Sequence, residues 1–207
     1  MSKARFITFE GIDGAGKSTH LAWAAELLRT WNVPLVVTRE PGGTALGESL
    51  RELLLNSEHP IQPESEVLMM FAARRQHIAD VIWPALHRGD WVLCDRFTDA
   101  SFAYQGGGRG VREETLLALE RIVHPELQPD LTVLFDVSTE IAQARVARIK
   151  SPDRFEREDA EFFQRVREAY LERMRRSAGR IVRIDGGGRI SDIQITLETL
   201  LLTMRGN

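Results

Sequence analysis

The stretch RFITFEGIDGAGKST, residues 5–19, decides the fold. An apolar run whose residues favour β-structure leads into Gly11, and a helical pattern begins after Thr19. Between the two stands G-x-x-x-x-G-K-S, with Lys17 and Ser18 in its last two places. A strand, a glycine-rich loop and a helix in that order form the context of a phosphate-binding P-loop, whereas a chance glycine turn requires none of these flanks.

A loop of this kind binds phosphate mainly with its backbone. Glycines allow several N–H groups to turn toward phosphate oxygens, and the helix N-terminus adds partial positive charge. Lys17 is predicted to reach the β- and γ-phosphates of ATP, and the Ser18 hydroxyl to hold Mg²⁺. The predicted ATP-binding residues are Gly11, Asp13, Gly14, Ala15, Gly16, Lys17, Ser18 and Thr19.

The composition is that of an ordinary globular protein. The chain has 207 residues, of which 43% are hydrophobic and 28% charged, and its net charge is −3. Nothing in this balance favours nucleic acid or an anionic membrane as a partner. No signal-like segment and no run of about 18 apolar residues stands out, so the cytoplasm is the expected location. One cysteine, Cys94, allows no internal disulfide and is expected to be a small buried hydrophobe.

Strand and helix patterns alternate along the chain. The expected strands after the first are 35–38, which is expected to be buried, 91–94, 131–137 and 180–184. The expected helices are 20–28, 46–54, 64–86, 113–123, 140–149, 160–177 and 190–204. Such alternation predicts an α/β fold, a five-stranded parallel sheet with helices on both faces, in one domain over 1–207.

Ligands of such sheets bind outside the carboxyl ends of the strands, which directs attention to two acidic residues. Asp95 and Asp136 each end an apolar strand, and either can hold Mg²⁺ as a Walker-type carboxylate. Asp95 is the preferred ligand because Arg96 adjoins it, so that the pair can serve a metal and a phosphate together. Asp136 precedes Ser138 and is expected to cap the next helix.

Cations also gather at these positions. Arg39 follows the second strand, Arg51 lies on the next helix, and Arg74 interrupts the apolar pattern of helix 64–86. A cation within an otherwise pocket-facing stripe requires an anion or a carbonyl as its partner. A solvated helix face or a structural ion pair is the alternative interpretation.

Two glycine-rich or charged connections remain. Residues 104–110 form a loop in which Tyr104 can stack on a base and Gln105 can hydrogen-bond its edge; the alternative is a flexible surface loop. Residues 148–159 carry several cations that can close over phosphates as a short lid. Solvated cations between two helices are the alternative here.

Together these segments resemble the bacterial thymidylate kinases. The strings that carry the resemblance, in the same order along the chain, are the P-loop 11–18, TREPGGT at 38–44, DRF at 95–97, AYQGGGRG at 103–110 and PDLT at 129–132. The resemblance implies a P-loop kinase fold, a three-layer sandwich with a lid. It also implies transfer of a phosphoryl group from ATP to dTMP with Mg²⁺, on a homodimer.

The resemblance also implies roles for individual residues. Lys17, Asp13 and Arg96 are expected at the reacting phosphates, with Ser18 and Asp95 on the metal. Tyr104 is expected against the sugar, where it disfavours a 2′-hydroxyl. The residues expected to bind the acceptor nucleotide are Arg39, Arg51, Met70, Phe71, Arg74, Arg96, Ser101, Tyr104 and Gln105.

The chain departs from the family pattern at two places. Relatives carry a base-stacking phenylalanine four residues before the base-contacting arginine, where this chain has Met70 followed by Phe71. In the lid, Ile149 stands where some relatives have the catalytic arginine, so Arg148 or Arg154 is expected to supply the transition-state cation. The P-loop has Gly14 where the eukaryotic branch carries an arginine, which makes a lid cation necessary.

The residues leave two other functions to consider. One is a P-loop kinase for a different nucleoside monophosphate. The other is a nucleotide-dependent switch without phosphoryl transfer, although the chain lacks the Asn-Lys-x-Asp motif with which GTPase switches read a base. No general base is evident, and none is required, because a monophosphate acceptor is mostly dianionic at pH 7.

Overall fold

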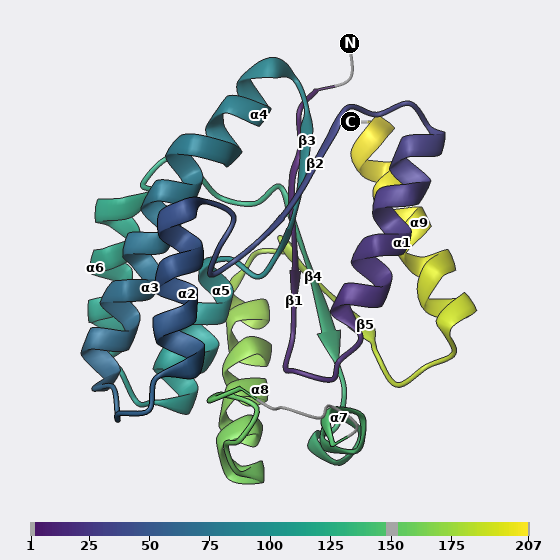
Figure 1. Cartoon of the computed structure of the whole chain (residues 1–207). Helices are drawn as coiled ribbons and strands as arrows, with labels where there is room; N and C mark the ends of the chain where they lie inside the picture. The colour runs from purple at the N-terminus through teal and green to yellow at the C-terminus, as the bar shows by residue number, and fades with distance from the viewer. Residues whose placement is uncertain (1–2, 148–152, 207) are drawn as a thin grey trace.

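The computed structural model describes residues 3–147 and 153–206 (Figure 1). Within them, parallel strands form one sheet in the order β2-β3-β1-β4-β5, as the alternating pattern predicts. The strands are β1 (Phe6–Glu10), β2 (Leu35–Arg39), β3 (Trp91–Asp95), β4 (Leu131–Asp136) and β5 (Ile181–Asp185). All carboxyl ends therefore meet at one edge, the lower edge in Figure 1.

Strand β1 is central and fully buried, because it pairs with β3 on one side and with β4 on the other. Its apolar run is typical of a strand covered on both faces. Strand β2 differs from the expectation of a buried strand. It is an edge strand, and its side chains are half-buried or exposed. Four apolar or β-branched residues in a row, 35–38, do not distinguish an edge from a centre.

Helices cover both faces of the sheet (Figure 1). The P-loop helix α1 and the C-terminal helix α9 pack together on one side, whereas α2, α3, α4 and α6 lie on the other. No helix of the described residues combines the length and the apolar composition that crossing a membrane requires. The helices are α1 (Lys17–Thr30), α2 (Ala45–Asn56), α3 (Pro63–His77), α4 (Trp83–Arg88), α5 (Thr98–Ser101), α6 (Glu113–Val123), α7 (Thr139–Val146), α8 (Ala160–Arg176) and α9 (Ile190–Gly206).

The long helical pattern expected over 64–86 is interrupted in its middle. A π-helical turn, η1 (Ile78–Ile82), joins α3 to α4. Pro84 lies in the first turn of α4, where its missing N–H is tolerated. The wider turn just before a proline accommodates the chain without ending the helix. Arg74 and His77 thereby stay on the α3 segment that faces the strand ends.

The glycine-rich segment is not the loop that the sequence suggests. Residues Phe102–Gly108 form a second π-helical segment, η2, which packs against α8. A Cβ on Gly107 would lie 2.5 Å from the Cβ of Ala169, and one on Gly108 would meet the ring of Phe162 at 2.5 Å. Glycine at these positions permits close helix packing rather than flexibility. The packing fixes Tyr104 and Gln105, whose side chains are buried.

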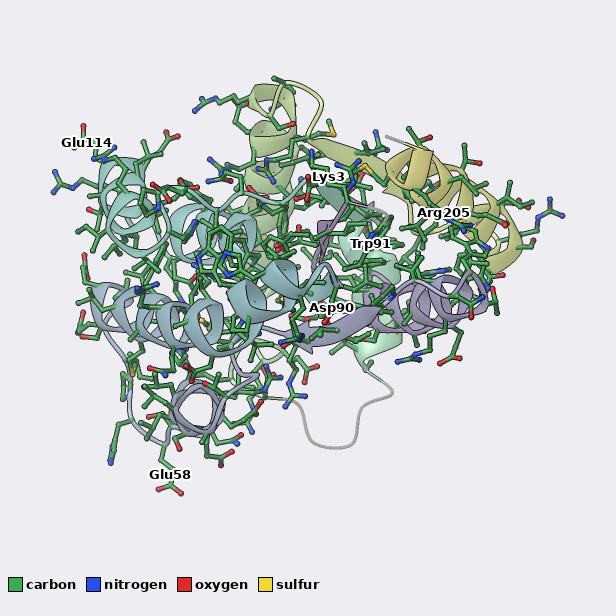
Figure 2. All side chains as sticks on the ribbon, turned by 90° about the horizontal axis from the view of Figure 1, so that it is seen from above. Lys3, Glu58, Asp90, Trp91, Glu114 and Arg205 are labelled. Carbon is green, nitrogen blue, oxygen red and sulfur yellow. The ribbon has the colours of Figure 1, made fainter. Side chains whose placement is uncertain are left out.

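At the opposite edge of the sheet, the N-terminal segment contacts the start of β3. Figure 2 looks onto it and shows Lys3, Asp90 and Trp91 close together where the strands begin. The indole N–H of Trp91 donates to the Lys3 carbonyl at 3.1 Å. The predicted site residues Arg39 and Asp95 instead lie at the carboxyl edge, where β2 and β3 end.

Candidate active site

The P-loop has the conformation that its glycines predict. Gly14 and Gly16 have φ of 82° and 95°, the left-handed region that glycine enters without strain. The Lys17 ammonium donates to the carbonyls of Gly11 and Ile12, both at 3.1 Å. Burial, followed by the positive charge of Arg96, lowers the pKa of Lys17. These two hydrogen bonds hold the lysine side chain against its own loop, at the start of α1.

Other predicted ATP-binding residues frame this loop. Ala15 is buried, and its N–H donates to the Ile12 carbonyl at 3.2 Å. Ser18 and Thr19 are exposed on the first turn of α1, where their hydroxyl groups can reach a ligand at the helix N-terminus.

Asp95 and Ser18 line one cleft of about 410 Å³. The Asp95 oxygen Oδ1 is buried and has no hydrogen-bond partner among the described residues. An orphaned carboxylate oxygen beside a P-loop hydroxyl fits the oxygen ligands that Mg²⁺ requires. The competing carboxylate is occupied, because Asp136 pairs with Arg167 and Arg183.

The expectation that Asp136 caps the following helix is wrong. The Ser138 hydroxyl is the cap of α7 and accepts from the backbone N–H of Ile141. Serine is a favoured N-cap residue, and Asp136 is instead held by its two arginine partners.

A second cavity, of about 90 Å³, lies beside the P-loop and brings together predicted acceptor-site residues from distant parts of the chain. Glu40, Pro41, Leu55, Phe97, Asp153 and Phe155 contribute to the same wall. We call this space the acceptor cavity. The predicted residues that line it are Asp13, Arg51, Met70, Arg74, Arg96, Ser101, Tyr104 and Gln105.

One end of the acceptor cavity is built around Arg96. Its Nη2 donates to Asp13 Oδ1 and, at 2.9 Å, to the Tyr104 hydroxyl, which in turn donates to Asp13 Oδ2 at 2.9 Å. The guanidinium lies 4.6 Å from the centre of the Tyr104 ring. Burial acts to raise the pKa of Asp13, but Arg96 and Lys17 outweigh it and lower the pKa to about 2. Arg96 has φ of 68°, an unusual conformation for a non-glycine residue that often marks functional sites.

Behind Arg96 lies a residue to which the sequence interpretation gave no role, Glu10. One of its oxygens accepts from the Phe97 N–H and the other from the Tyr170 hydroxyl, both at 2.7 Å, and Tyr170 also accepts from Arg96 at 3.3 Å. Burial and the negative charge of Asp99 raise the pKa of Glu10 to about 8. Its place at the end of β1 was the available signal, because the strand-end rule applies to Glu10 as it does to Asp95.

The other end of the acceptor cavity is built around Arg74, which is 2% exposed. Its Nε donates to Glu40 Oε2 at 2.7 Å, and its Nη2 donates to the Phe97 carbonyl and the Ser101 hydroxyl, both at 3.1 Å. Its Nη1 is buried and has no partner among the described residues. An unpaired buried donor at a cavity wall marks a place for a ligand acceptor atom.

Glu40 carries a second partner besides Arg74. The His77 Nδ1 lies 2.9 Å from Glu40 Oε1, and its Nε2 lies 2.7 Å from the Thr38 hydroxyl. Burial acts to raise the pKa of Glu40, but Arg74 and His77 outweigh it and leave the pKa below its usual value. The carboxylate thus connects the end of β2 with α3.

The structure separates Met70 from Phe71. Met70 lines the acceptor cavity. Phe71 is 2% exposed and packs in a hydrophobic cluster with Phe102, and its ring stacks on His124 at a centroid distance of 6.4 Å. Adjacent helix positions differ by about 100° in direction, so one of the two must turn away. Phe71 touches the site indirectly, because the Arg74 guanidinium lies 4.6 Å from its ring centre.

Of two further predicted cations, one lines the acceptor cavity and the other lines the cleft beside it that contains Ser18 and Asp95. Arg51 lines the acceptor cavity and donates to the Pro41 carbonyl at 2.9 Å. Arg39 instead lines the cleft that contains Ser18 and Asp95, and its Nη2 donates to both Glu48 carboxylate oxygens at 2.9 and 3.0 Å. Arg39 is more than half-exposed, and a rotation releases it from this surface pair.

The lid cations are only partly described. Arg148 and Ile149 lie outside the described residues. Arg154 does not point at the P-loop: its Nε donates to the Leu54 carbonyl at 2.8 Å, and its Nη2 donates to Glu66. Arg145, from the end of α7, contacts the loop instead, where its Nη1 donates to the Gly14 carbonyl at 3.0 Å and to Gly186 at 3.1 Å.

Comparison with known proteins agrees with this arrangement. The model of the family described as thymidylate kinase matches residues 9–196. The thymidylate kinase of Ralstonia nicotianae is 57% identical over 204 residues, covering 97% of this chain and 98% of that protein. The thymidylate kinase of Bordetella pertussis is 55% identical over 197 residues, covering 95% and 94%. A crystal structure of thymidylate kinase from Ehrlichia chaffeensis superposes with a TM-score of 0.78 at 34% identity, covering 96% of this chain and 98% of that one. The chain therefore belongs to the thymidylate kinase family.

Proposed function

We propose that this protein transfers the γ-phosphoryl group of ATP to dTMP, giving dTDP and ADP. The observation that carries the proposal is the acceptor cavity, in which a fixed cation stands at each end. Arg96 with Asp13 faces the P-loop, and Arg74 presents a buried, unpartnered N–H at the other end. A nucleoside monophosphate has a phosphate at one end and a hydrogen-bonding base edge at the other, which matches this polarity.

The acceptor's phosphate is assigned to the Arg96 end. Arg96 and Arg51 line the cavity there and can hold the phosphate against the P-loop. Arg39, now paired with Glu48, is assigned to the same phosphate after it rotates. Because the acceptor phosphate is already mostly dianionic at pH 7, its oxygen attacks without a base. Positioning two anions against each other is the main task, and arginines fixed in advance perform it.

The base of dTMP is assigned to the Arg74 end. Arg74 Nη1 is the donor for a base carbonyl, and Ser101 and Gln105 lie on the same wall. Met70 provides a polarizable thioether for one face of the ring. Tyr104, between the two ends, is assigned to the sugar.

ATP is assigned to the P-loop. Lys17 exchanges the Gly11 and Ile12 carbonyls for the β- and γ-phosphates, which are stronger acceptors because they are charged. Ser18 and Asp95 would hold Mg²⁺, and a bound Mg²⁺ would offset the negative charge of the ATP phosphates. Arg145 already touches the P-loop and adds a cation on the α7 side, while Arg148 stays a prediction outside the described residues.

A coupled assay of ADP release tests the reaction. ADP production from ATP and Mg²⁺ should depend strictly on dTMP. ADP release that is equal with and without dTMP would overturn the kinase proposal. The alternative acceptor class is tested in the same assay with dUMP, CMP and AMP. A higher kcat/KM for any of these than for dTMP would replace dTMP as the acceptor.

The proposal includes a homodimer in the cytoplasm. Large apolar side chains are exposed on three helices of one side of the molecule, which supports a second copy as their cover. They are Leu46 and Leu53 on α2, Leu68 on α3 and Ile122 on α6. The cytoplasmic location follows the expectation from sequence, and fractionation of cells is its measurement.

A further inference from the structure

Glu66, on α3, is a fully buried carboxylate that no part of the proposed mechanism uses. The Gln105 amide nitrogen donates to its Oε1 at 2.8 Å. Its Oε2 faces two guanidinium groups, Arg154 by a direct hydrogen bond and Arg109 at 3.5 Å. A buried charge with this many partners is well compensated, so it can serve a positional role without a large cost.

The chemistry of Glu66 determines which way the Gln105 amide points. A carboxylate that faces two cations accepts hydrogen bonds and donates none. The –NH₂ end of Gln105 must therefore face Glu66, because the carbonyl end of the amide has no proton to donate to a carboxylate. Gln105 is 1% exposed and lines the acceptor cavity, so the end that it can offer to a ligand there is its carbonyl oxygen.

We propose that Glu66 is a specificity-determining positioning residue, which holds Gln105 as an acceptor so that, beside the Arg74 donor, the cavity selects a base edge with a carbonyl next to a ring N–H. The inference rests on the function proposed above. Thymine and uracil present this edge as O4 and N3–H. Cytosine presents the reverse, an amino group next to an unprotonated ring nitrogen, so that donor would meet donor and acceptor would meet acceptor.

The expected discrimination is large because both protein groups are buried. A site built to hydrogen-bond its substrate rejects an analogue that leaves those groups unpaired by about 10⁴-fold. Glu66→Gln removes the constraint, since a glutamine at 66 can accept from Gln105 or donate to it. The Gln105 amide can then present its –NH₂ end to the ring nitrogen of cytosine. Arg74 is unchanged, so the preference should fall without reversing.

The measurement is the ratio of kcat/KM for dTMP to kcat/KM for dCMP. Glu66→Gln should lower this ratio by roughly tenfold or more relative to the wild type. Glu158→Gln is the matched control, because Glu158 pairs with the same Arg109, whereas the Gln105 side chain donates to Glu66. The control should keep the wild-type ratio. Where dCMP turnover is too slow to follow, the ratio of the dissociation constants serves the same purpose.

A double-mutant cycle shows whether Glu66 acts through Gln105. Gln105→Met keeps the side-chain length and removes the amide. In that background, Glu66→Gln should change the dTMP to dCMP ratio no further. Two variants whose effects on the ratio multiply independently would contradict the proposal, as would a wild-type ratio in Glu66→Gln alone.

The wild-type protein provides a test if Glu66→Gln does not fold. A dTMP analogue methylated at N3 has no proton for the Gln105 carbonyl and should lose at least a hundredfold in kcat/KM, in line with a buried acceptor left unpaired. An N3-methyl analogue that is used as well as dTMP would overturn the assigned amide orientation. Absence of any dTMP-dependent ADP release would instead remove the proposed function, so the two failures are distinguishable.

Discussion

At the scale of single residues, both ends of the acceptor cavity follow one design. Each working arginine is held by a carboxylate that comes from a strand end or from the P-loop: Asp13 holds Arg96, and Glu40 holds Arg74. Because a carboxylate fixes each arginine in place, the cations would need little reorganisation to meet a nucleotide. Preorganised charge of this kind is a major source of stabilisation in phosphoryl transfer.

In the proposed function Arg74 combines a structural ion pair with recognition of the base, so the choice of substitution matters. Arg74→Ala would leave Glu40 as an uncompensated buried charge and cost about 3–5 kcal/mol of folding stability. Arg74→Lys keeps the charge beside Glu40 but loses the planar fork that also reaches Phe97, Ser101 and the cavity. We expect Arg74→Lys to raise the dTMP KM by about tenfold to a hundredfold, while thermal unfolding shifts much less than in Arg74→Ala. An unchanged dTMP KM in the lysine variant would show that Arg74 is only structural.

Glu10 gives the folded protein a pH dependence with a definite sign. Its pKa is raised from 4.5 to about 8, so the folded state binds this proton more tightly than the unfolded state does. Stability is therefore highest below pH 4.5 for this group and falls as the pH rises toward 8, by up to about 1.4 kcal/mol per pH unit. Glu10→Gln should flatten that fall, because the amide can still accept from Phe97 and donate to Tyr170.

Urea unfolding of wild type and Glu10→Gln at pH 5.5 and pH 8 measures the difference. The stability of the variant relative to wild type should be more favourable at pH 8 than at pH 5.5. Asp13 and Glu40 have lowered pKa values and titrate below this window in both proteins, so they cancel. Parallel pH profiles for the two proteins would mean that Glu10 is ionised throughout the range.

The residues that the sequence predicted are those whose role is visible from their own position. Asp95 ends an apolar strand, and Arg74 interrupts an apolar stripe, so each is anomalous where it stands. Their partners are less apparent: Glu66 looks like an ordinary surface glutamate of a helix, and nothing in the string TREPGGT indicates that Glu40 pairs with Arg74. The Arg74–Glu40 pair joins positions 34 residues apart, and only the tertiary fold brings them together.

At the scale of elements, the P-loop depends on how closely α7 approaches it. A Cβ at Gly14 would lie 2.4 Å from the Ala142 carbonyl oxygen, so that the loop and the helix fit only with glycine there. Glycine is therefore required at position 14 for the close packing of α7 as well as for its positive φ. The same contact leaves no room for a larger side chain unless α7 moves.

A pair of glycine variants separates these two contributions. Gly14 and Gly89 have similar φ, 82° and 89°, but a Cβ at Gly89 would meet nothing within 4 Å. Gly89→Ala should cost about 1–2 kcal/mol of stability, from backbone strain alone, with kcat unchanged. Gly14→Ala should cost about 1–3 kcal/mol more and raise the KM for ATP. Equal losses of stability in the two variants would mean that α7 can move away from the added Cβ at little cost.

Periodicity predicted most elements but not their irregular parts. The strand–loop–helix at 5–19 and the helix at 113–123 have strong patterns and appear where expected. The three consecutive glycines predict a loop over residues 104–110, but tight packing on α8 overrides their low helix propensity and Phe102–Gly108 form a π-helical segment. The turn at Ile78–Ile82 leaves no mark in hydrophobic spacing at all.

At the scale of the whole molecule, both helical sides expose large apolar side chains, with Ile195 of α9 among them. Figure 2 shows Glu114 of α6 and Arg205 of α9 at opposite ends of the molecule. Leu53 on α2 and Leu68 on α3 are more than half-exposed on the α6 side. The proposed homodimer places these leucines in the interface.

A charge on this surface should therefore break the dimer. We expect wild type to have about twice the 23.4 kDa chain mass in size-exclusion chromatography with light scattering. Leu53→Glu should shift the protein to the monomer mass at micromolar concentration. Ile195→Glu is the matched control, because Ile195 is 65% exposed, against 57% for Leu53, but lies on α9. A monomeric wild type, or dissociation by the α9 variant alone, would contradict the proposed interface.

The sheet as a whole was the most predictable level. Alternating strands and helices determine a parallel sheet, and a parallel sheet determines which edge carries ligands. From that rule alone the sequence placed Asp13, Arg96 and Asp95 at one edge. Whether a strand is central or at an edge was harder to predict, since β2 has an apolar run and yet is an edge strand.

The carboxylate of Glu40 contacts both Arg74 and His77, and these contacts limit how the three positions can change in evolution. A lineage that loses Arg74 or Glu40 leaves the other without its ion-pair partner, and one that loses His77 leaves Glu40 Oε1 without that hydrogen-bond partner, so single changes among the three should be rare. Accepted changes should come in concert, as a set replaced together. Positions 40, 74 and 77 should then covary among related sequences. Their joint pattern would show how the Arg74 end of the acceptor cavity has diversified.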